Sequence, residues 1–333
     1  MDISEFKIAQ VGVIGHYEYI RKNNSGLDVR LCAIAPGGEG EDVSVIRGEE
    51  IGRNAKIYSD WREMIENEKP DVLIVNSYMN LNAKISIFAL ERGIHVFCEK
   101  PVATTFADLG ALENAYKAAN KVKKTCFCGM FGILDNDAFV DADEICKSGK
   151  IGEIRLVNAQ KSYRLGNREP FYSSREMLGG MIPWVAIHAI DWIYHICKLD
   201  FNAVTASHSA VGNGGNGELE ATALMLLESA NGAVASVSAD YLRPSSAKTH
   251  DDDRIRIVGT RGIIEIRDGE FTSIPEGICA EVHGKKSIFS EFMHEIAGEG
   301  ECRVSARETI DVTRIALTAR ESADCGRKIG ISL

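Results

Sequence analysis

The sequence predicts an α/β protein of two domains, a doubly wound parallel sheet followed by an α/β domain with a larger mixed or antiparallel sheet. Between residues 7 and 130, short apolar runs alternate with segments of helical periodicity, as in a parallel sheet that helices cover on both faces. Beyond about Phe131 the apolar segments are longer and alternate with polar residues, which is typical of strands with one covered face. The length of 333 residues also favours two domains, which we place at residues 1–131 and 132–333.

Local signals predict the elements of the first domain. Ser59 is a candidate cap for a helix that runs to Glu66, and Thr105 begins another helix. Gly93 ends the helix between them. The expected strands are 7–14, 29–35, 57–58, 72–75, 96–98 and 125–130, and the expected helices are 59–66, 82–92 and 105–121.

In the second domain we expect a helix over residues 137–148 and a second helical segment over 180–197. Ser305 and Glu308 form a capping box that opens a last helix, which closes at Gly326. We expect this helix, 305–325, to pack back toward the first domain. The expected strands are 153–163, 203–209, 220–228, 232–241, 254–258 and 262–267.

The composition excludes several classes of protein. Net charge is −10 without a long basic run, so nucleic acid and anionic membrane surfaces are not expected partners. The nine cysteines lie mostly in apolar runs and form no CxxC pair, which predicts reduced thiols, a cytoplasmic location and no metal site. The N-terminus lacks the basic segment of a signal peptide, and the apolar window 181–196 is too short and too polar to span a bilayer.

A glycine-containing turn follows the first strand. In Gly12-Val13-Ile14-Gly15-His16, Gly12 fits the first position of a GxGxxG fingerprint, but Ile14 occupies the second and Gly15 comes one residue late. The turn is compatible with dinucleotide binding and equally with a plain strand-turn-helix glycine. No acidic residue ends the second strand at Ala35, and the acidic loop after it would repel a 2′-phosphate, so NAD is favoured over NADP.

Lys100 stands where the strand 96–98 ends, within Glu99-Lys100-Pro101. Lysine is seldom placed there without a function, because its ammonium is expensive to bury and ligands bind at the carboxyl ends of parallel strands. Such a lysine can transfer a proton or stabilise negative charge. The alternative is a side chain whose stem covers apolar surface while its head reaches water.

The segment 182–197 places four functional candidates on one helix face if it is a regular helix: Trp184, His188, Asp191 and His195. In the functional interpretation, His188 faces a cleft and Asp191 fixes its tautomer, while Trp184 offers a flat surface to a sugar ring or a nicotinamide. The alternative is a half-buried helix whose polar groups bond to one another. His195 is expected to be structural or to lie at an interface.

Several segments together resemble the Gfo/Idh/MocA family of NAD(P)-dependent oxidoreductases. They are Gly93-Ile94-His95-Val96-Phe97-Cys98-Glu99-Lys100-Pro101-Val102-Ala103, residues 148–154, Gly179-Gly180 with His188 and Asp191, residues 258–262 and residues 320–327. The resemblance implies an N-terminal Rossmann domain, a C-terminal domain with a large open sheet, a sugar, inositol or polyol substrate, and a homo-oligomer, dimer or tetramer, built on the exposed sheet face.

The resemblance also implies roles for individual residues. Lys100 and His188, with Asp191, are the expected catalytic residues at the substrate carbinol, which requires them to meet at a shared crevice. The expected cofactor-binding residues are Gly12, Ile14, Gly15, His16, Asn76, Ser77, Glu99 and Pro101. The expected substrate-binding residues are Tyr163, Arg164 and Trp184.

The chain also departs from the family pattern. Trp184 stands in place of an aspartate, Ala186 in place of a glycine, Ser77-Tyr78 in place of Thr-Pro, and Asn82 in place of a histidine. Three interpretations therefore stay open: a hydride-transfer enzyme, a member that has lost redox activity and serves as a ligand-binding or regulatory protein, and a lyase-like or hydrolytic member that uses tightly held NAD.

Loop charges give further candidates. Arg168 and Arg175 follow Tyr163-Arg164, and Arg243 lies in a second loop. These arginines could bind a carboxylate or phosphate of the substrate, or be solvated surface charges. The run of three aspartates at 251–253 could bind a hard cation, or simply be hydrated.

Overall fold

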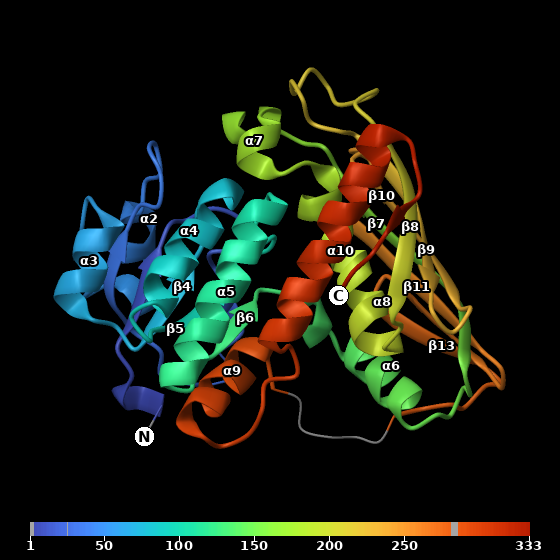
Figure 1. Cartoon of the computed structure of the whole chain (residues 1–333), viewed down its shortest axis with the longest axis horizontal. Helices are drawn as coiled ribbons and strands as arrows, with labels where there is room; N and C mark the ends of the chain where they lie inside the picture. Colours follow the sequence, from blue (N-terminus) through green and yellow to red (C-terminus); the bar gives the residue numbers. More distant parts are fainter. Residues whose placement is uncertain (1–2, 25, 281–285) are drawn as a thin grey trace. The chain divides into compact units, whose positions relative to one another are not determined.

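The computed structural model describes residues 3–24, 26–280 and 286–333 (Figure 1). Its contacts divide the chain into two compact units. The first comprises Met1–Gly132 and Lys286–Ile310, and the second comprises Ile133–Lys285 and Asp311–Leu333. No helix in the described part of the chain is both long enough and apolar enough to cross a bilayer.

The first unit contains a six-stranded sheet in the order β3-β2-β1-β4-β5-β6, with every pair of neighbours parallel. This order is that of the Rossmann fold. All residues of β1, β4 and β5 are buried, which explains why these strands are short continuous apolar runs. The strands are β1 Ile8–Val11, β2 Leu31–Ala35, β3 Lys56–Ile57, β4 Val72–Val75, β5 His95–Cys98 and β6 Phe127–Gly129.

The helices of this unit begin at well-defined caps. Thr105 caps α5 as predicted, by accepting a hydrogen bond from Asp108 N. The predicted cap Ser59 is wrong, because the Asp60 carboxylate accepts from Arg62 N and Glu63 N at 2.8 Å each and α3 begins one residue later. The helices are α1 Tyr19–Lys22, α2 Ser44–Arg47, α3 Trp61–Glu68, α4 Met79–Leu90, α5 Phe106–Val122 and α9 Ile288–Ala297.

The second unit is built on an eight-stranded mixed sheet, in the order β13-β12-β11-β7-β10-β9-β8-β14. Among the strands that the structure describes in this sheet, only β7 and β10 pair in parallel. Burial alternates along its strands, as on β9, where Met225 is buried and Leu224 and Leu226 are exposed. The strands are β7 Ile154–Tyr163, β8 Phe201–Ser209, β9 Thr222–Ser229, β10 Val234–Asp240, β11 Asp251–Gly259, β12 Ile263–Arg267, β13 Glu270–Ile274 and β14 Ile329–Gly330. The fold class predicted for both domains is confirmed.

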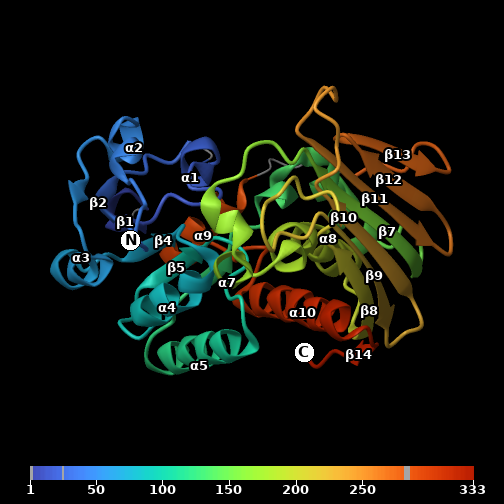
Figure 2. The ribbon, with the colours of Figure 1, turned by 90° about the horizontal axis from the view of Figure 1, so that it is seen from above.

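Helices of the second unit cover one face of this sheet. α8 packs against β7 and β10, and α6 packs against α8 and β12 (Figures 1 and 2). Ser305 caps the last helix as predicted, by accepting from Glu308 N at 3.1 Å. The helices are α6 Asp137–Lys147, α7 Arg175–Leu178, α8 Ile187–Cys197 and α10 Ala306–Cys325, of which the residues up to Ile310 are grouped with the first unit.

The predicted regular helix over 182–197 needs a correction. Ile182–Ala186 form a π-helical turn, in which Ile187 N donates to Ile182 O, and the α-helical part begins only at Ile187. The wider turn breaks the spacing that placed Trp184 in line with His188. The alternative of a half-buried helix does not describe α8 either, because every residue of α8 except Tyr194 is buried.

Candidate functional site

The glycine turn after β1 is fixed by the end of β4. Gly12 has φ +82°, and a Cβ there would lie 2.2 Å from Asn76 O. Ile14 N donates to Asn76 O at 2.7 Å, and Gly12 N donates to Ala35 O at 2.8 Å. The left-handed conformation and the close approach both require glycine at position 12. The structure thus brings the predicted cofactor residues Gly12, Ile14 and Asn76 together.

Glu99 closes the other side of this turn. Its fully buried carboxylate accepts from His16 N at 2.5 Å, from His16 Nδ1 at 3.0 Å and from Lys100 N at 2.9 Å. A Cβ on Gly15 would lie 2.5 Å from Glu99 Oε2. Burial alone would raise the pKa of Glu99, but His16 and the charge of Lys100 outweigh it, so the pKa lies below its usual value. Glu99 is therefore an anion that anchors the glycine turn.

Lys100 and Pro101 follow directly, at the carboxyl end of β5. The Lys100 side chain is 1% exposed. The buried amide of Asn82, on α4, donates to Glu99 O at 3.1 Å and to Pro101 O at 3.2 Å. Asn82, one of the departures from the family pattern, therefore holds the backbone on both sides of Lys100.

Glu41 also belongs to this site, although the sequence predicts only that it lies in an acidic loop. Its carboxylate accepts from Val13 N at 3.1 Å, from Gly38 N at 2.8 Å and from Ser77 Oγ at 2.7 Å. Burial raises the pKa of Glu41, although these hydrogen bonds oppose the rise. The missing acid at the end of β2 is thus replaced in space by a residue six positions further along the chain, which Gly37 and Gly38 allow to turn back.

This arrangement fits a nicotinamide dinucleotide. Glu41 lies beside the first glycine of the turn, where a ribose-binding carboxylate belongs. Among the described residues, the backbone N–H groups of Gly15 and Tyr17 have no hydrogen-bond partner, so they are available to a pyrophosphate. Gly12, Ile14, Gly15, His16, Asn76, Ser77, Glu99 and Pro101 all lie around this turn or in the segments bonded to it.

The catalytic candidates of the second unit lie on α8. His188 and Asp191 are each 1% exposed and stand three residues apart. The role of Asp191 in orienting His188 stays a prediction. His195 lies 3.7 Å from Asp143 of α6, so it joins two helices of the same unit.

Tyr163 and Trp184, two predicted substrate residues, belong to a layer of aromatic rings. Tyr163 stacks on Tyr241 with ring centroids 6.3 Å apart, and Trp184 meets Tyr172 edge-on at 6.1 Å. The Arg168 guanidinium carbon lies 4.7 Å from the Tyr241 ring centroid and 5.1 Å from that of Tyr172. We call the four rings, those of Tyr163, Tyr172, Trp184 and Tyr241, the aromatic layer. Tyr172 is not among the site residues predicted from the sequence.

Most loop charges of the second unit are paired with one another. Arg175 pairs with Glu220 and Asp324, and Arg243 with Asp252. The three aspartates are all engaged in ion pairs: Asp252 also pairs with Arg254, and Asp251 and Asp253 with the buried Lys161. Within residues 3–24, 26–280 and 286–333, no cluster of histidine, cysteine, aspartate or glutamate is arranged to hold a metal ion.

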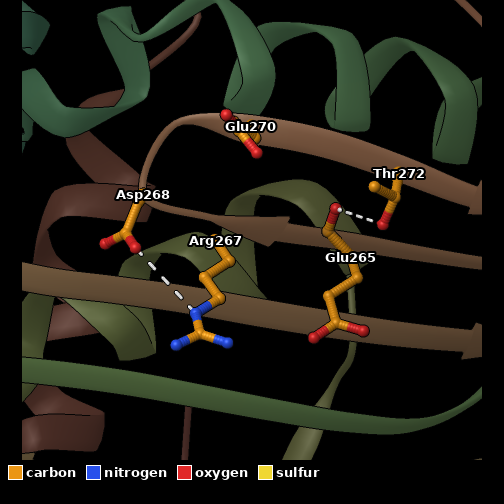
Figure 3. Close-up of a pocket in the computed structure, with 5 residues that line it drawn as sticks. All are labelled: Glu265, Arg267, Asp268, Glu270 and Thr272. Carbon is orange, nitrogen blue, oxygen red and sulfur yellow. Dashed lines mark hydrogen bonds and ion pairs between the residues drawn. The ribbon is translucent and has the colours of Figure 1, made fainter.

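Two surface cavities of the second unit lie apart from the catalytic candidates. One, of about 510 Å³, is lined by residues of the β12–β13 hairpin (Figure 3). Its polar contacts are internal: Arg267 Nε is 3.9 Å from Asp268, and Thr272 Oγ1 donates to Glu265 O at 3.5 Å. The other, of about 230 Å³, includes Asp253. Neither contains a residue that the sequence assigns to catalysis.

Comparisons with known proteins identify the family. Residues 6–130 match the model described as "Oxidoreductase family, NAD-binding Rossmann fold", and residues 139–265 match the "GFO/IDH/MocA C-terminal domain". The chain belongs to the Gfo/Idh/MocA family. Its first unit is thus the NAD-binding Rossmann domain of that family, and the predicted resemblance is confirmed.

Individual members of the Gfo/Idh/MocA family are similar to this chain to different degrees. A solved putative oxidoreductase from Thermotoga maritima is 45% identical, with a TM-score of 0.91, covering 98% of this chain and 100% of that one. A myo-inositol 2-dehydrogenase from the same organism is 26% identical over 63% of this chain and 60% of its own length. An inositol 2-dehydrogenase from Salmonella paratyphi B is 24% identical over 59% of this chain. The match spans only 55% of that enzyme.

Proposed function

We propose that this protein is an NAD-dependent oxidoreductase that oxidises a CH–OH group of a sugar, an inositol or a related polyol by hydride transfer. The observation that carries the proposal is the glycine turn, fixed by Glu99 directly before Lys100 and by Glu41 beside Gly12. Family membership and the inositol dehydrogenases among the relatives support the reaction class.

The cofactor-binding residues would be those that surround the turn. Glu41 would accept hydrogen bonds from the adenosine ribose, and its charge would disfavour the 2′-phosphate of NADP. Gly15 would present its backbone N–H to the pyrophosphate. Bound NAD supplies the carbon that accepts the hydride.

The chain's own groups would handle the proton. His188 or Lys100 would take the proton of the substrate hydroxyl, and the ammonium of Lys100 would stabilise the negative charge that develops on the oxygen. Asp191 would fix the tautomer of His188, and Tyr163, Arg164 and Trp184 would hold the substrate.

The test is a fluorescence titration with NADH and NADPH, followed by initial rates with NAD⁺ on myo-inositol and on a panel of neutral sugars, sugar acids and sugar phosphates. We expect NADH to bind more tightly than NADPH and at least one polyhydroxy compound to be oxidised. If neither nucleotide binds at millimolar concentration, the protein is instead the ligand-binding or regulatory member. NAD that copurifies with the protein, without net turnover, would favour the lyase-like or hydrolytic alternative.

The proposal includes a cytoplasmic homo-oligomer. All nine cysteines are free, in keeping with a reducing compartment. Leu156, Leu224, Leu226 and Val234 are exposed large apolar residues on three neighbouring strands of the large sheet. We expect sedimentation velocity to show a dimer or tetramer for the wild-type protein. Leu224→Lys places a charge on this apolar face and should dissociate the oligomer. A monomeric wild-type protein would contradict this part of the proposal.

A further inference from the structure

Arg164 and Arg168 differ from the other candidate arginines of the second unit. Whereas Arg175 and Arg243 form ion pairs, neither Arg164 nor Arg168 has a carboxylate partner in the part of the chain that the structure describes. The Nε atoms of both are buried and lack a hydrogen-bond partner there. A buried charged donor without a partner is costly, so such groups are normally satisfied by a ligand or by water.

The backbone and side chains hold both arginines in place. Arg164 N donates to His250 O at 3.0 Å, and Arg168 Nη2 donates to Arg164 O at 2.8 Å. The Arg168 guanidinium also lies over the rings of Tyr172 and Tyr241. Among the described residues, the bond to Arg164 O is the only hydrogen bond of the Arg168 side chain, so most of its five N–H donors remain available. A guanidinium stacked in this way is ordered before any ligand arrives.

The charged groups near the aromatic layer differ in how they are paired. Lys161, on the same strand as Tyr163, faces two carboxylates, those of Asp251 and Asp253. No such pair balances Arg164 and Arg168. The pKa of His250, next to Tyr163, is lowered chiefly by burial and further by the charges of these two arginines.

We propose that Arg164 and Arg168, beside the aromatic layer, bind an anionic group of the substrate, a carboxylate or a phosphate carried by a sugar or polyol. Planar guanidinium groups match both anions by paired hydrogen bonds, and the tyrosine and tryptophan rings suit the apolar face of a sugar. This inference rests on the proposed function, because it names the class of substrate, and it predicts that uncharged inositols and sugars are poor ligands.

The experiment compares glucose, glucuronate and glucose 6-phosphate, which share one ring and differ in charge. Binding is measured by saturation-transfer NMR with and without NADH, and KM by initial rates with NAD⁺ where turnover occurs. We expect one of the two anions to bind about tenfold to a hundredfold more tightly than glucose, and the stronger of the two identifies carboxylate or phosphate. Equal binding of glucose and both anions, or binding of none of them while NADH binds, would overturn the inference.

Variants separate this site from a general effect of charge. Arg168→Gln should remove the preference for the anion and leave NADH affinity unchanged. Arg168→Lys should keep part of the anion preference. Arg155→Gln, at the other end of β7, removes the same charge from an exposed position. It should change neither the anion preference nor the NADH affinity. An anion preference that Arg168→Gln leaves intact would contradict the assignment. Rising salt should weaken anion binding by the wild-type protein and leave glucose binding unaffected, a readout that does not depend on any variant.

The two proposals can fail independently. If the anion binds and Arg168→Gln abolishes its binding, while no NADH binds, the anion site stands and the dehydrogenase assignment falls. If NADH binds and neutral polyols are oxidised with the same KM by the wild-type protein and Arg168→Gln, the dehydrogenase stands and the anion site falls.

Discussion

The carboxylate of Glu41 accepts a hydrogen bond from the backbone N–H of Val13 at 3.1 Å. Val13 is the residue after Gly12, so this acid lies against the first turn of the glycine loop although it comes from a distant part of the sequence. A Cβ on Gly12 would lie 2.6 Å from Glu41 Oε2. The position and charge of Glu41 make it the main candidate for selecting NAD over NADP.

Replacing Glu41 with glutamine should therefore shift cofactor preference. Glu41→Gln keeps the shape of the side chain but removes the negative charge that opposes a 2′-phosphate. We expect the ratio of NADPH to NADH affinity to rise about tenfold, measured by fluorescence titration. Glu39→Gln, an exposed charge of the same loop, serves as the control and should leave the ratio unchanged. A similar shift in both variants would mean that the loop's net charge, and not Glu41, sets the preference.

Lys100→Met is expected to lower turnover strongly while NADH affinity stays near that of the wild-type protein. Methionine fills a similar volume in this buried position but can neither donate a proton nor stabilise an alkoxide. The rate should fall by about a hundredfold to ten-thousandfold. His188→Asn should lose activity to a similar extent. Unchanged kcat in either variant would remove that residue from the proposed acid–base role.

Much of the fold could be predicted from the sequence because its signals are local. The parallel strands are visible as continuous apolar runs. Thr105 and Ser305 cap helices by accepting hydrogen bonds from backbone N–H groups three residues further along the chain. Helix α9 is absent from the prediction although its ends carry local signals, the cap Ser287, which accepts from Ser290 N, and Gly298. The sequence does not show its tertiary contact, in which Phe289 and Phe292 pack on Phe97 of β5 with ring centroids 5.4 and 5.3 Å apart.

The candidate site also contains some residues that local sequence signals reveal and others that they do not. Glu99 and Lys100 could be found because they directly follow a strand, and ligand sites of parallel sheets lie at strand ends. Glu41 could not be assigned, because its role depends on a loop that turns back through Gly37 and Gly38. The prediction gave Trp184 the wrong position around the helix. Pro183 marks an irregularity there, but it does not reveal that Ile182–Ala186 form a π-helical turn.

The buried histidine of the family-like motif, His95, should make stability depend on pH. Its Nδ1 accepts a hydrogen bond from Cys126 N at 2.9 Å, and burial lowers its pKa from 6.5 to about 4. The unfolded chain takes up a proton near pH 6.5, whereas folded His95 resists protonation down to about pH 4. Its contribution to stability is therefore complete above pH 6.5 and is lost as the pH falls toward 4.

We expect the free energy of unfolding to fall by about 3 kcal/mol across this window on account of His95. His95→Gln keeps a hydrogen-bond acceptor but cannot take up a proton, so this part of the pH dependence should disappear. Urea unfolding of both proteins at several pH values measures the difference, with His294→Gln on α9 as the control. Parallel pH curves for the wild-type protein and His95→Gln would show that His95 does not cause the loss.

Gly12→Ala tests whether the close contact at Gly12 matters beyond the backbone strain of a positive φ. Gly93→Ala, which has the strain without the contact, is the matched control. Both glycines have positive φ, +82° and +69°, so alanine is strained at either position by about 1 kcal/mol. Only Gly12 faces an obstacle, because its added Cβ would lie 2.2 Å from Asn76 O, whereas nothing lies within 4 Å at Gly93. Gly12→Ala should therefore lower the free energy of unfolding by about 3 kcal/mol and weaken NADH binding strongly. Gly93→Ala should lose only the strain energy and bind NADH normally. If urea unfolding gives the two variants equal stability and titration gives them equal NADH affinity, the close approach of Gly12 to β4 does not shape the cofactor site.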